Sequence, residues 1–432
     1  MKRINLKSTF LKSLAVLASG SLIAQMFTAV QQPLLTRVFS AEQLGAYTYL
    51  LSIPLTFIGV ICARYDAAIV YEEDESKIFP LIKLNLLITL VLSLLVSLLY
   101  VVYLIFFNPD YVRYLYLMPF ICLYLIAYGI TNVLNAYNNR NGEYKMISKM
   151  HVVRTAIQVI GVLVPGLFFV ALLKWDWLSM PILVLPFCLG MFFGVFSQAK
   201  PLKEHWKEIL YAPWSEVKKV ATLHRKQPLL STPAVYANSM SYSVITLFIE
   251  GLYNEALLGY YSISTRLLGM PLSLISGNVS KVYMEQAAKE YAKTGGYAKT
   301  FKKTLLFLLA LALPMFLVMY FLAPPVCEWV FGEGWDIAGR YIKLLALMFS
   351  ARFVATAVSP GLYVCRKQQY ELLIQIALLG ASLIAGLVAV LTSASIEQFL
   401  WYICLFKSVV FVLSIVIVYI FSKPRKSKEV TL

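Results

Sequence analysis

The sequence predicts an all-α membrane protein, with twelve transmembrane helices in two parallel-repeat six-helix bundles around a central cavity. Composition, the recurrence of apolar runs and a similarity between the two halves predict this class. Of the 432 residues, 60% are hydrophobic and only 14% are charged, and the mean hydropathy is +0.73. A soluble core of this size does not need so much apolar sequence. We therefore expect the bilayer to surround most side chains, which excludes a soluble enzyme with a single membrane anchor.

Twelve apolar segments of about 20 residues are long enough to cross roughly 30 Å of hydrocarbon. Nine of them contain no charged residue: 13–36, 43–63, 84–107, 114–135, 155–173, 177–199, 227–249, 304–323 and 372–396. Three contain one cation each: 256–280 with Arg266, 344–365 with Arg352, and 398–422 with Lys407. The first segment has the basic flank of a signal peptide, but eleven segments follow it. We interpret it as an uncleaved first helix.

The basic residues predict the orientation. The net charge is +16, and most Lys and Arg fall on the side of the first segment's basic flank. The opposite loops hold only Arg37, Arg113, Lys174, Arg340 and Lys343. By the positive-inside rule, both termini are cytoplasmic. Topology thus accounts for most of the basic excess, and we expect no nucleic-acid partner.

The chain divides into four parts: an N-terminal six-helix bundle (1–199), a cytoplasmic basic linker (200–226), a C-terminal six-helix bundle (227–422) and a cytoplasmic tail (423–432). The linker is expected to lie against anionic lipid headgroups, with a regulatory partner site as the alternative. When the two halves of the sequence are aligned with an offset of 214 residues, residues 44–47 (LGAY) correspond to residues 258–261 (LGYY). Because six is even, the two bundles have the same orientation, as in many transporters.

Polar residues within the apolar segments predict the lining of a cavity. Gln25 and Gln32 share one helical face. In the alignment of the two halves with an offset of 214 residues, Gln32 corresponds to Thr246, and Thr28 corresponds to Tyr242. Gln25, Gln32, Asn238 and Tyr242 are candidates for contacting a sugar chain. Hydrogen bonding between helices is an equally common use of such residues.

Cations inside the apolar segments are the main candidates for binding. Arg266, Arg352 and Lys407 each lie near the middle of a segment, where an unpaired charge is costly unless it faces water or a counter-charge. They favour an anionic substrate in the cavity. Arg64 and Arg154 lie near cytoplasmic ends, where they either line the entry or extend to the headgroups.

The chain carries little that suggests catalysis. The three histidines, His151, His205 and His224, are not spaced as ligands on one helix, and the cysteines are scattered, so neither a metal site nor a disulfide framework is expected. No GxxxxGK[ST] motif occurs, so we do not expect ATP hydrolysis or any cofactor. The sequence therefore indicates no catalytic residues.

Two stretches resemble the polysaccharide repeat-unit flippases of the multidrug/oligosaccharidyl-lipid/polysaccharide exporter superfamily. Residues 32–75, which contain LLTR, QLGAY and ARYD, are similar to that family's Leu-Thr-Arg, Leu-Gly and Arg-Tyr-acidic pattern. Residues 225–290, with YNEALLGYYSISTRLLG, are like its signature in the seventh and eighth helices. The resemblance marks Arg37 and Arg64 as motif members and Arg266 as a cavity cation. Asp66 stands where many relatives have Glu.

The resemblance implies a V-shaped pair of bundles working by alternating access. The implied substrate is an undecaprenyl-pyrophosphate-linked oligosaccharide, moved from the cytoplasmic to the periplasmic leaflet of a bacterial inner membrane for O-antigen, capsule or exopolysaccharide synthesis. Implied partners are membrane lipid and the polysaccharide polymerase and chain-length machinery. The alternatives are a cation-coupled multidrug exporter of the same superfamily and a membrane polysaccharide polymerase or ligase.

Overall fold

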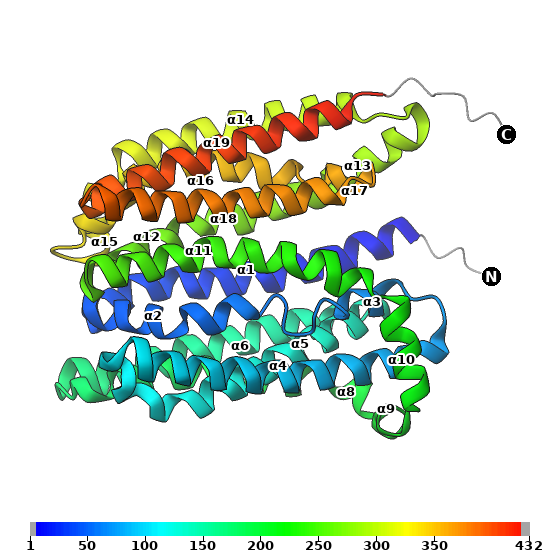
Figure 1. The fold of residues 1–432 in the computed structure, drawn as a ribbon, viewed down its shortest axis with the longest axis horizontal. Coiled ribbons are helices and arrows are strands. Elements are labelled where there is room, and N and C mark those ends of the chain that lie inside the picture. The colour runs from blue at the N-terminus through cyan, green and yellow to red at the C-terminus, as the bar shows by residue number, and fades with distance from the viewer. Residues whose placement is uncertain (1–5, 425–432) are drawn as a thin grey trace. The chain divides into compact units, whose positions relative to one another are not determined.

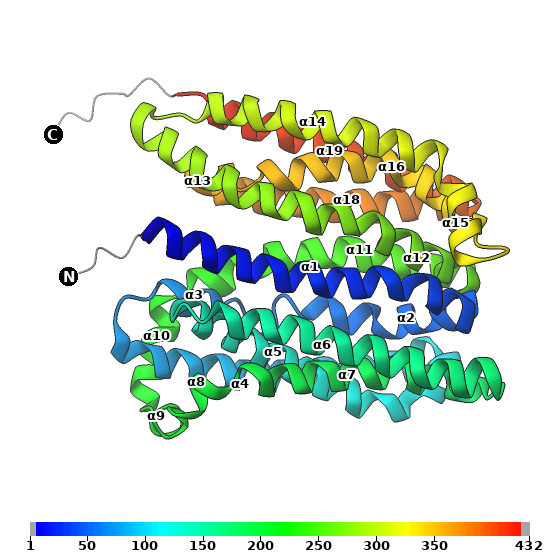
Figure 2. The same cartoon turned by 180° about the vertical axis from the view of Figure 1, so that it is seen from behind.

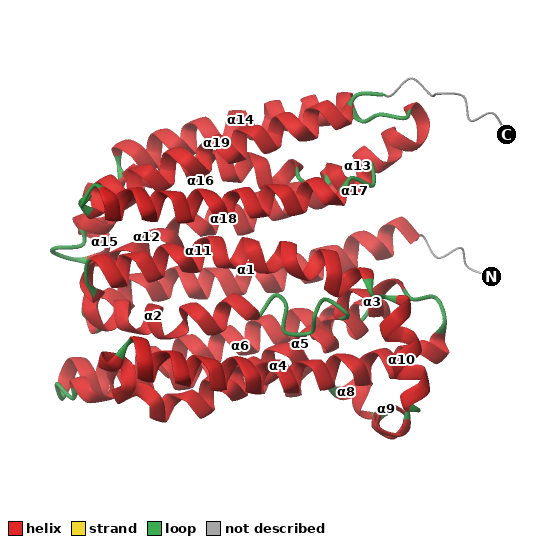
Figure 3. Cartoon of the chain, in the orientation of Figure 1, coloured by secondary structure: helices red, strands yellow, loops and turns green. Residues whose placement is uncertain are grey.

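A computed structural model describes residues 6–424 of the chain, with side chains from Ser19 onward except at Ser273. All regular secondary structure in this described part is helical (Figure 3), which confirms the all-α prediction. The chain divides into two compact units, residues 1–239 and 240–432, with the boundary inside α11. Of the predicted tail, residues 425–432 lie outside the described part, as do the side chains of Lys7 and Lys12.

The first unit contains six long helices and several short ones (Figures 1 and 2). The long helices are α1 (Leu6–Val38), α2 (Ala41–Phe57), α4 (Ile78–Phe107), α5 (Met118–Arg140), α6 (Tyr144–Pro165) and α7 (Ser179–Gln198). The short elements are α3 (Asp66–Tyr71), α8 (Lys200–Lys203), α9 (Trp206–Tyr211), α10 (Trp214–Leu223), η1 (Glu75–Lys77), η2 (Pro109–Leu117), η3 (Gly166–Leu172), η4 (Asp176–Leu178) and η5 (Gln227–Ser231). Helix α6 packs against α1 and α7, and α5 packs against α4 and α7. The predicted linker forms α8, α9 and α10, which lie at the same end of the unit as α3 (Figures 1 and 2).

The second unit is built around α16. Its elements, after α11 (Thr232–Leu252), are α12 (Glu255–Pro271), η6 (Leu272–Ser276), α13 (Gly277–Thr294), α14 (Ala298–Phe321), α15 (Ala323–Phe331), α16 (Asp336–Val358), α17 (Gly361–Val364), α18 (Gln368–Leu391) and α19 (Ile396–Ser422). Helix α16 contacts α12, α14, α15 and α19, and α18 packs on α19. Among the candidate membrane spans, α16 lies in the most buried and α14 is the least buried. The core of this unit therefore centres on α16, while α14 exposes most of its apolar surface.

By length and composition, eight helical stretches of the described residues can cross a membrane: Glu75–Phe107, Pro109–Arg140, Tyr144–Leu172, Asp176–Gln198, Ala298–Phe321, Asp336–Val364, Gln368–Leu391 and Ile396–Ser422. Each coincides with a predicted segment. The other four predicted segments, 13–36, 43–63, 227–249 and 256–280, also fall on helices, namely α1, α2, α11 and the run from α12 to α13. As membrane spans, those four stay predictions.

Proline accounts for the wide π-helical turns that interrupt three of the helical runs. Turn η3 follows Pro165, η6 follows Pro271, and η5 contains Pro228. Proline has no N–H to donate to the carbonyl four residues earlier, and its ring crowds that carbonyl. The local turn widens as a result, so these runs continue through their prolines with a bulge instead of ending.

Helix α2 ends earlier than the sequence indicates. The predicted segment 43–63 is helical only to Phe57, and residues 58–65 form successive turns before α3. Ala63 and Arg64 adopt left-handed backbone angles, with φ of 46° and 61°, which residues other than glycine rarely adopt. Side chains pair part of the freed backbone, because Asn132 Nδ2 donates to the Ile58 carbonyl at 3.4 Å. The prediction of one apolar helix over residues 43–63 is therefore wrong for residues 58–63.

Candidate functional site

Two of the three predicted cavity cations meet at one aromatic ring in the second unit. Lys407 Nζ on α19 lies 3.7 Å from the ring centre of Tyr242 on α11. The guanidinium carbon of Arg352 on α16 lies 4.3 Å from the same centre and 5.6 Å from that of Phe349. Three helices that are distant in sequence thus bring a lysine, an arginine and a tyrosine together. We call Arg352, Lys407 and Tyr242 the cation cluster.

Lys407 is held in place by the backbone of α11. Its side chain is fully buried, and Nζ donates to the Ser241 carbonyl at 3.0 Å and to the Ser241 hydroxyl oxygen at 3.4 Å. The same carbonyl accepts a hydrogen bond of 2.7 Å from the Ser382 hydroxyl on α18. Three helices are therefore fastened at Ser241, and the position of the Lys407 charge is fixed relative to the Tyr242 ring.

No carboxylate among the described residues neutralises the charge of the cation cluster. Among the described residues, no carboxylate oxygen lies within 4.0 Å of the side-chain nitrogens of Arg352 or Lys407. The Tyr242 hydroxyl is buried and makes no hydrogen bond to any described residue. Buried charges are normally paired, so two cations sharing one ring leave a locally positive site with a spare hydroxyl. An anion with several oxygens is the chemical complement of such a site.

The remaining predicted cation of this unit, Arg266, is half-buried on α12, a helix that packs against α16. In the first unit, Arg154 lies ten residues after the start of α6 at Tyr144. Its Nε is buried and makes no hydrogen bond to a described residue. Helix α7 approaches this part of α6 closely, because a Cβ on Gly190 would lie 2.6 Å from the Arg154 carbonyl oxygen.

Arg64 occupies the interrupted part of the second predicted span. The segment is not helical there, and Arg64 Nη1 lies 3.9 Å from Asp66 Oδ2. Arg64 is thus placed by backbone turns and an acidic neighbour.

The predicted polar lining residues of the first unit have different surroundings. Gln32 is buried on α1, and its Nε2 donates to the Thr28 carbonyl at 3.2 Å, a bond within the helix. Gln25 on α1 and Asn238 on α11 are half-buried. Only Tyr242, in the second unit, belongs to the cation cluster.

A second polar cluster, which the sequence did not single out, joins the linker to α3. His224 Nε2, at the end of α10, lies 2.8 Å from Glu72 Oε2, and Arg140 Nη1 donates to the Glu72 carbonyl. Arg140 Nη2 also lies 2.7 Å from Glu75 Oε1, and Lys77 Nζ lies 4.0 Å from Glu72 Oε1. We call Glu72, Glu75, Lys77, Arg140 and His224 the linker cluster. Its sequence signal is the acidic run at residues 72–75, within the stretch that resembles the flippase family.

The electrostatics of the linker cluster favour the ionised form of Glu72. Burial alone raises the pKa of its carboxyl group. Hydrogen bonds from the Asp74 backbone N–H and His224, together with the charge of Lys77, outweigh burial and lower the pKa of Glu72 below its ordinary value of 4.5. The charged carboxylate therefore stabilises the attachment of α10 to the α3 end of the unit.

Metal ligation receives no support from the described residues. Within this part of the chain, no group of three or more His, Cys, Asp or Glu side chains is placed to hold a metal ion.

The fold is similar to that of several solved transport proteins. The lipid II flippase MurJ in an inward closed conformation superposes with a TM-score of 0.72 at 11% identity, covering 93% of this chain and 87% of that one. An inward-facing multidrug resistance transporter of the MATE family gives 0.68 at 12% identity, covering 93% and 97%. A superfamily transporter from Pyrococcus furiosus gives 0.64 at 11% identity, covering 96% and 97%.

The family follows from the sequence itself. The chain belongs to the polysaccharide biosynthesis protein family, whose model matches residues 34–340. No curated protein sequence matches the chain. The matched range contains Arg64, Arg154, Tyr242 and Arg266. The family resemblance derived from the two motif stretches is thereby confirmed.

Proposed function

We propose that this protein is a flippase that moves undecaprenyl-pyrophosphate-linked oligosaccharide repeat units from the cytoplasmic to the periplasmic leaflet. The observation that carries the proposal is the cation cluster, where Arg352 and Lys407 share the Tyr242 ring without a carboxylate. A pyrophosphate offers several anionic oxygens to such a site. Membership of the polysaccharide biosynthesis family and a fold shared with the lipid II flippase MurJ support a lipid-linked sugar as the substrate.

The proposed mechanism is alternating access by two bundles of six membrane helices around a central cavity. The sugar and pyrophosphate cross through the cavity, while the lipid chain stays in the apolar phase, so no sugar is exposed to hydrocarbon. A membrane potential that is negative inside draws the anionic head outward, by about 2.3 kcal/mol per charge per 100 mV. Arg266 adds charge to the cavity, and Arg64 and Arg154 lie on the cytoplasmic entry. Gln25, Gln32 and Asn238 contribute to sugar binding.

The proposal places the protein in a bacterial inner membrane with both termini in the cytoplasm. Its product serves O-antigen, capsule or exopolysaccharide synthesis, and the polysaccharide polymerase and chain-length machinery are its functional partners. The fold that it shares with transporters supports transport rather than catalysis.

The test compares variants in a strain that lacks the gene, measuring lipid-linked oligosaccharide on the cytoplasmic side and polysaccharide at the cell surface. Wild type should restore surface polymer. Arg352→Ala and Lys407→Met should leave the lipid-linked intermediate in the cytoplasmic leaflet, because each removes one charge from the cation cluster. Lys407→Met replaces the buried side chain by an unbranched apolar one that is one atom shorter, and such apolar replacements are often tolerated.

Arg113→Ala is the matched control, because Arg113 also stacks on a ring, Tyr114 at 4.8 Å, but is exposed and far in sequence from the cluster. It should export normally. All variants are compared at equal amounts of folded protein. Normal export by both cluster variants would refute the role of the cation cluster.

The rival with structural support is a cation-coupled drug exporter, because the MATE transporters share the fold. It requires a carboxylate within the membrane, and the sequence had suggested none. Glu371, in the first turn of α18, is partly buried and accepts a hydrogen bond of 2.7 Å from Gln375. If the rival holds, the protein should confer drug resistance and Glu371→Gln should abolish it. If our proposal holds, neither effect occurs.

A further inference from the structure

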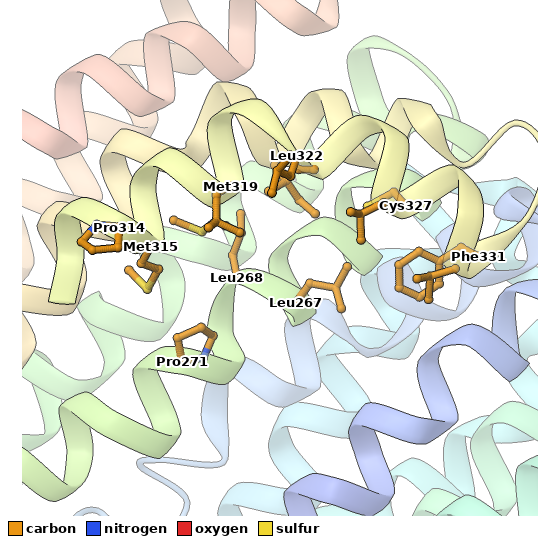
Figure 4. Close-up of a pocket in the computed structure, with 14 residues that line it drawn as sticks. Leu267, Leu268, Pro271, Pro314, Met315, Met319, Leu322, Cys327 and Phe331 are labelled. Atoms are coloured by element: carbon orange, nitrogen blue, oxygen red, sulfur yellow. The ribbon is translucent and has the colours of Figure 1, made fainter.

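An apolar groove lies in the second unit between α12, α14, α15 and the start of α16 (Figure 4). Its volume is about 510 Å³, within the range of small-molecule sites. No lining side chain carries an oxygen or nitrogen atom. In Figure 4, Met319 and Leu322 lie across from Leu267 and Leu268. The groove belongs entirely to this unit and does not include the cation cluster.

The lining suits a long, flexible hydrocarbon chain. Pro314 within α14 and Pro271 at the end of α12 both line the groove. Each proline removes a backbone hydrogen bond and bends its helix, so the two helices do not pack closely along their whole length. Met315 and Met319 contribute unbranched side chains that adapt to irregular apolar surfaces. Val318 and Leu322 are exposed, so the groove is open on the side where α14 presents apolar surface.

A cation stands beside the groove. Ile342 lines it, and the next residue, Lys343, is exposed with its Nζ 4.8 Å from the ring centre of Tyr320. Tyr320 directly follows Met319 of the lining. Among the described residues, Lys343 makes no ion pair. An apolar channel with one unneutralised cation at its edge is complementary to an amphiphile that has a hydrocarbon chain and a phosphate at one end.

We propose that this groove binds the isoprenoid chain of a polyprenyl phosphate lipid, with Lys343 contacting the phosphate. The inference rests on the proposed function, since it assigns a place on this chain to the lipid part of the substrate. It separates two tasks: the cation cluster contacts the head group during transfer, and the groove holds the lipid. The Lys343 end of the groove is also on the side that the positive-inside rule assigns to the periplasm.

The test is retention of lipid by the purified full-length protein, followed by native mass spectrometry. The probes are undecaprenyl phosphate, the uncharged undecaprenol and dioleoyl phosphatidylglycerol at equal concentration. Wild type should retain undecaprenyl phosphate in preference to phosphatidylglycerol. Met319→Trp fills the groove and should weaken retention of both undecaprenyl lipids by at least about tenfold. Lys343→Gln should weaken retention of undecaprenyl phosphate alone.

Two matched variants serve as controls. Leu313→Trp adds the same ring to an exposed position of α14 outside the groove, and Arg340→Gln removes a cation that pairs with Asp336 at 3.4 Å. Both should retain undecaprenyl phosphate like wild type. Lys343→Gln changes only an exposed side chain, so the test remains valid if Met319→Trp fails to fold.

Equal retention of phosphatidylglycerol and undecaprenyl phosphate, or no effect of Lys343→Gln, would overturn the proposal and make the groove an ordinary phospholipid site. Arg352→Ala separates this inference from the proposed function. If Arg352→Ala blocks export but Met319→Trp and Lys343→Gln retain lipid normally, only the groove assignment fails. If retention follows our expectation but wild type exports no lipid-linked sugar, the groove stands and the flippase proposal fails.

Discussion

The ring of Tyr242 provides a sharp test at the scale of single residues, because two cations contact its π-system while its hydroxyl has no hydrogen-bond partner among the described residues. Tyr242→Phe keeps the ring and should keep most export. Tyr242→Ala removes both cation–π contacts, worth about 0.5–2 kcal/mol each, and should strongly reduce export. The measurement is surface polysaccharide at equal protein level. If Tyr242→Phe is as defective as Tyr242→Ala, the hydroxyl and not the ring is the important group.

The carboxylate of Glu72 predicts a pH dependence. Its pKa is lowered in the folded protein, so its ionised form contributes stability above its ordinary pKa of 4.5. That contribution is lost as the pH falls through the lowered pKa, because the neutral carboxylic acid no longer attracts the charge of Lys77. We expect the unfolding temperature of wild type in detergent to fall more steeply below pH 4.5 than that of Glu72→Gln. Glu73→Gln, at an exposed neighbour, should follow wild type.

Sequence reasoning identified the residue types of the candidate site but not its partners. Arg352 and Lys407 were recognisable because a charge inside an apolar segment is costly. Their shared contact with Tyr242 depends on how α11, α16 and α19 pack, which no local pattern encodes. The pairing of His224 with Glu72 spans 152 residues and was missed for the same reason.

At the scale of helices, two glycines of α18 form a matched pair. A Cβ on Gly386 would lie 2.1 Å from a ring carbon of Phe248 on α11, whereas a Cβ on Gly380 would meet nothing within 4 Å. Gly386→Ala should therefore cost about 1–3 kcal/mol of stability, as overpacking does. Gly380→Ala should be stabilising by about 0.5–1 kcal/mol, because alanine favours the helix. Unfolding temperatures in detergent would check both values. Equal effects would show that α11 and α18 do not approach each other so closely.

The helices themselves were largely predictable, because each of the twelve apolar segments overlaps a helix for most of its length. The prediction from the sequence failed where the backbone angles, and not the apolar composition, determine the path of the chain. Residues 58–63 are as apolar as the helix before them. Ala63 and Arg64 adopt left-handed backbone angles, but neither is a glycine, so the sequence does not indicate this conformation. The sequence showed Pro165 and Pro271, but it did not show that a π-helical turn follows each of them.

For the whole molecule, the distribution of Lys and Arg predicts sidedness. Single cysteines would report it, since Glu333 lies in the exposed connection between α15 and α16 and Glu204 is exposed in the linker. In intact cells, a membrane-impermeant maleimide should label Glu333→Cys but not Glu204→Cys. The native cysteines are buried or partly buried, which keeps the background low. The opposite labelling pattern would reverse the topology and the proposed direction of transport.

The interruption at residues 58–65 also has a mechanical consequence for the first unit. An unbroken helix transmits a displacement along its length as a rod does, whereas a segment of turns acts as a joint. The part beyond this joint is tied elsewhere: Tyr65 Oη donates to the Ala221 carbonyl of α10 at 3.0 Å, and Arg140 of α5 donates to the carbonyls of Ile69 and Glu72. Helix α3 is therefore held by α5 and α10, so its position does not depend on the backbone path from α2 alone.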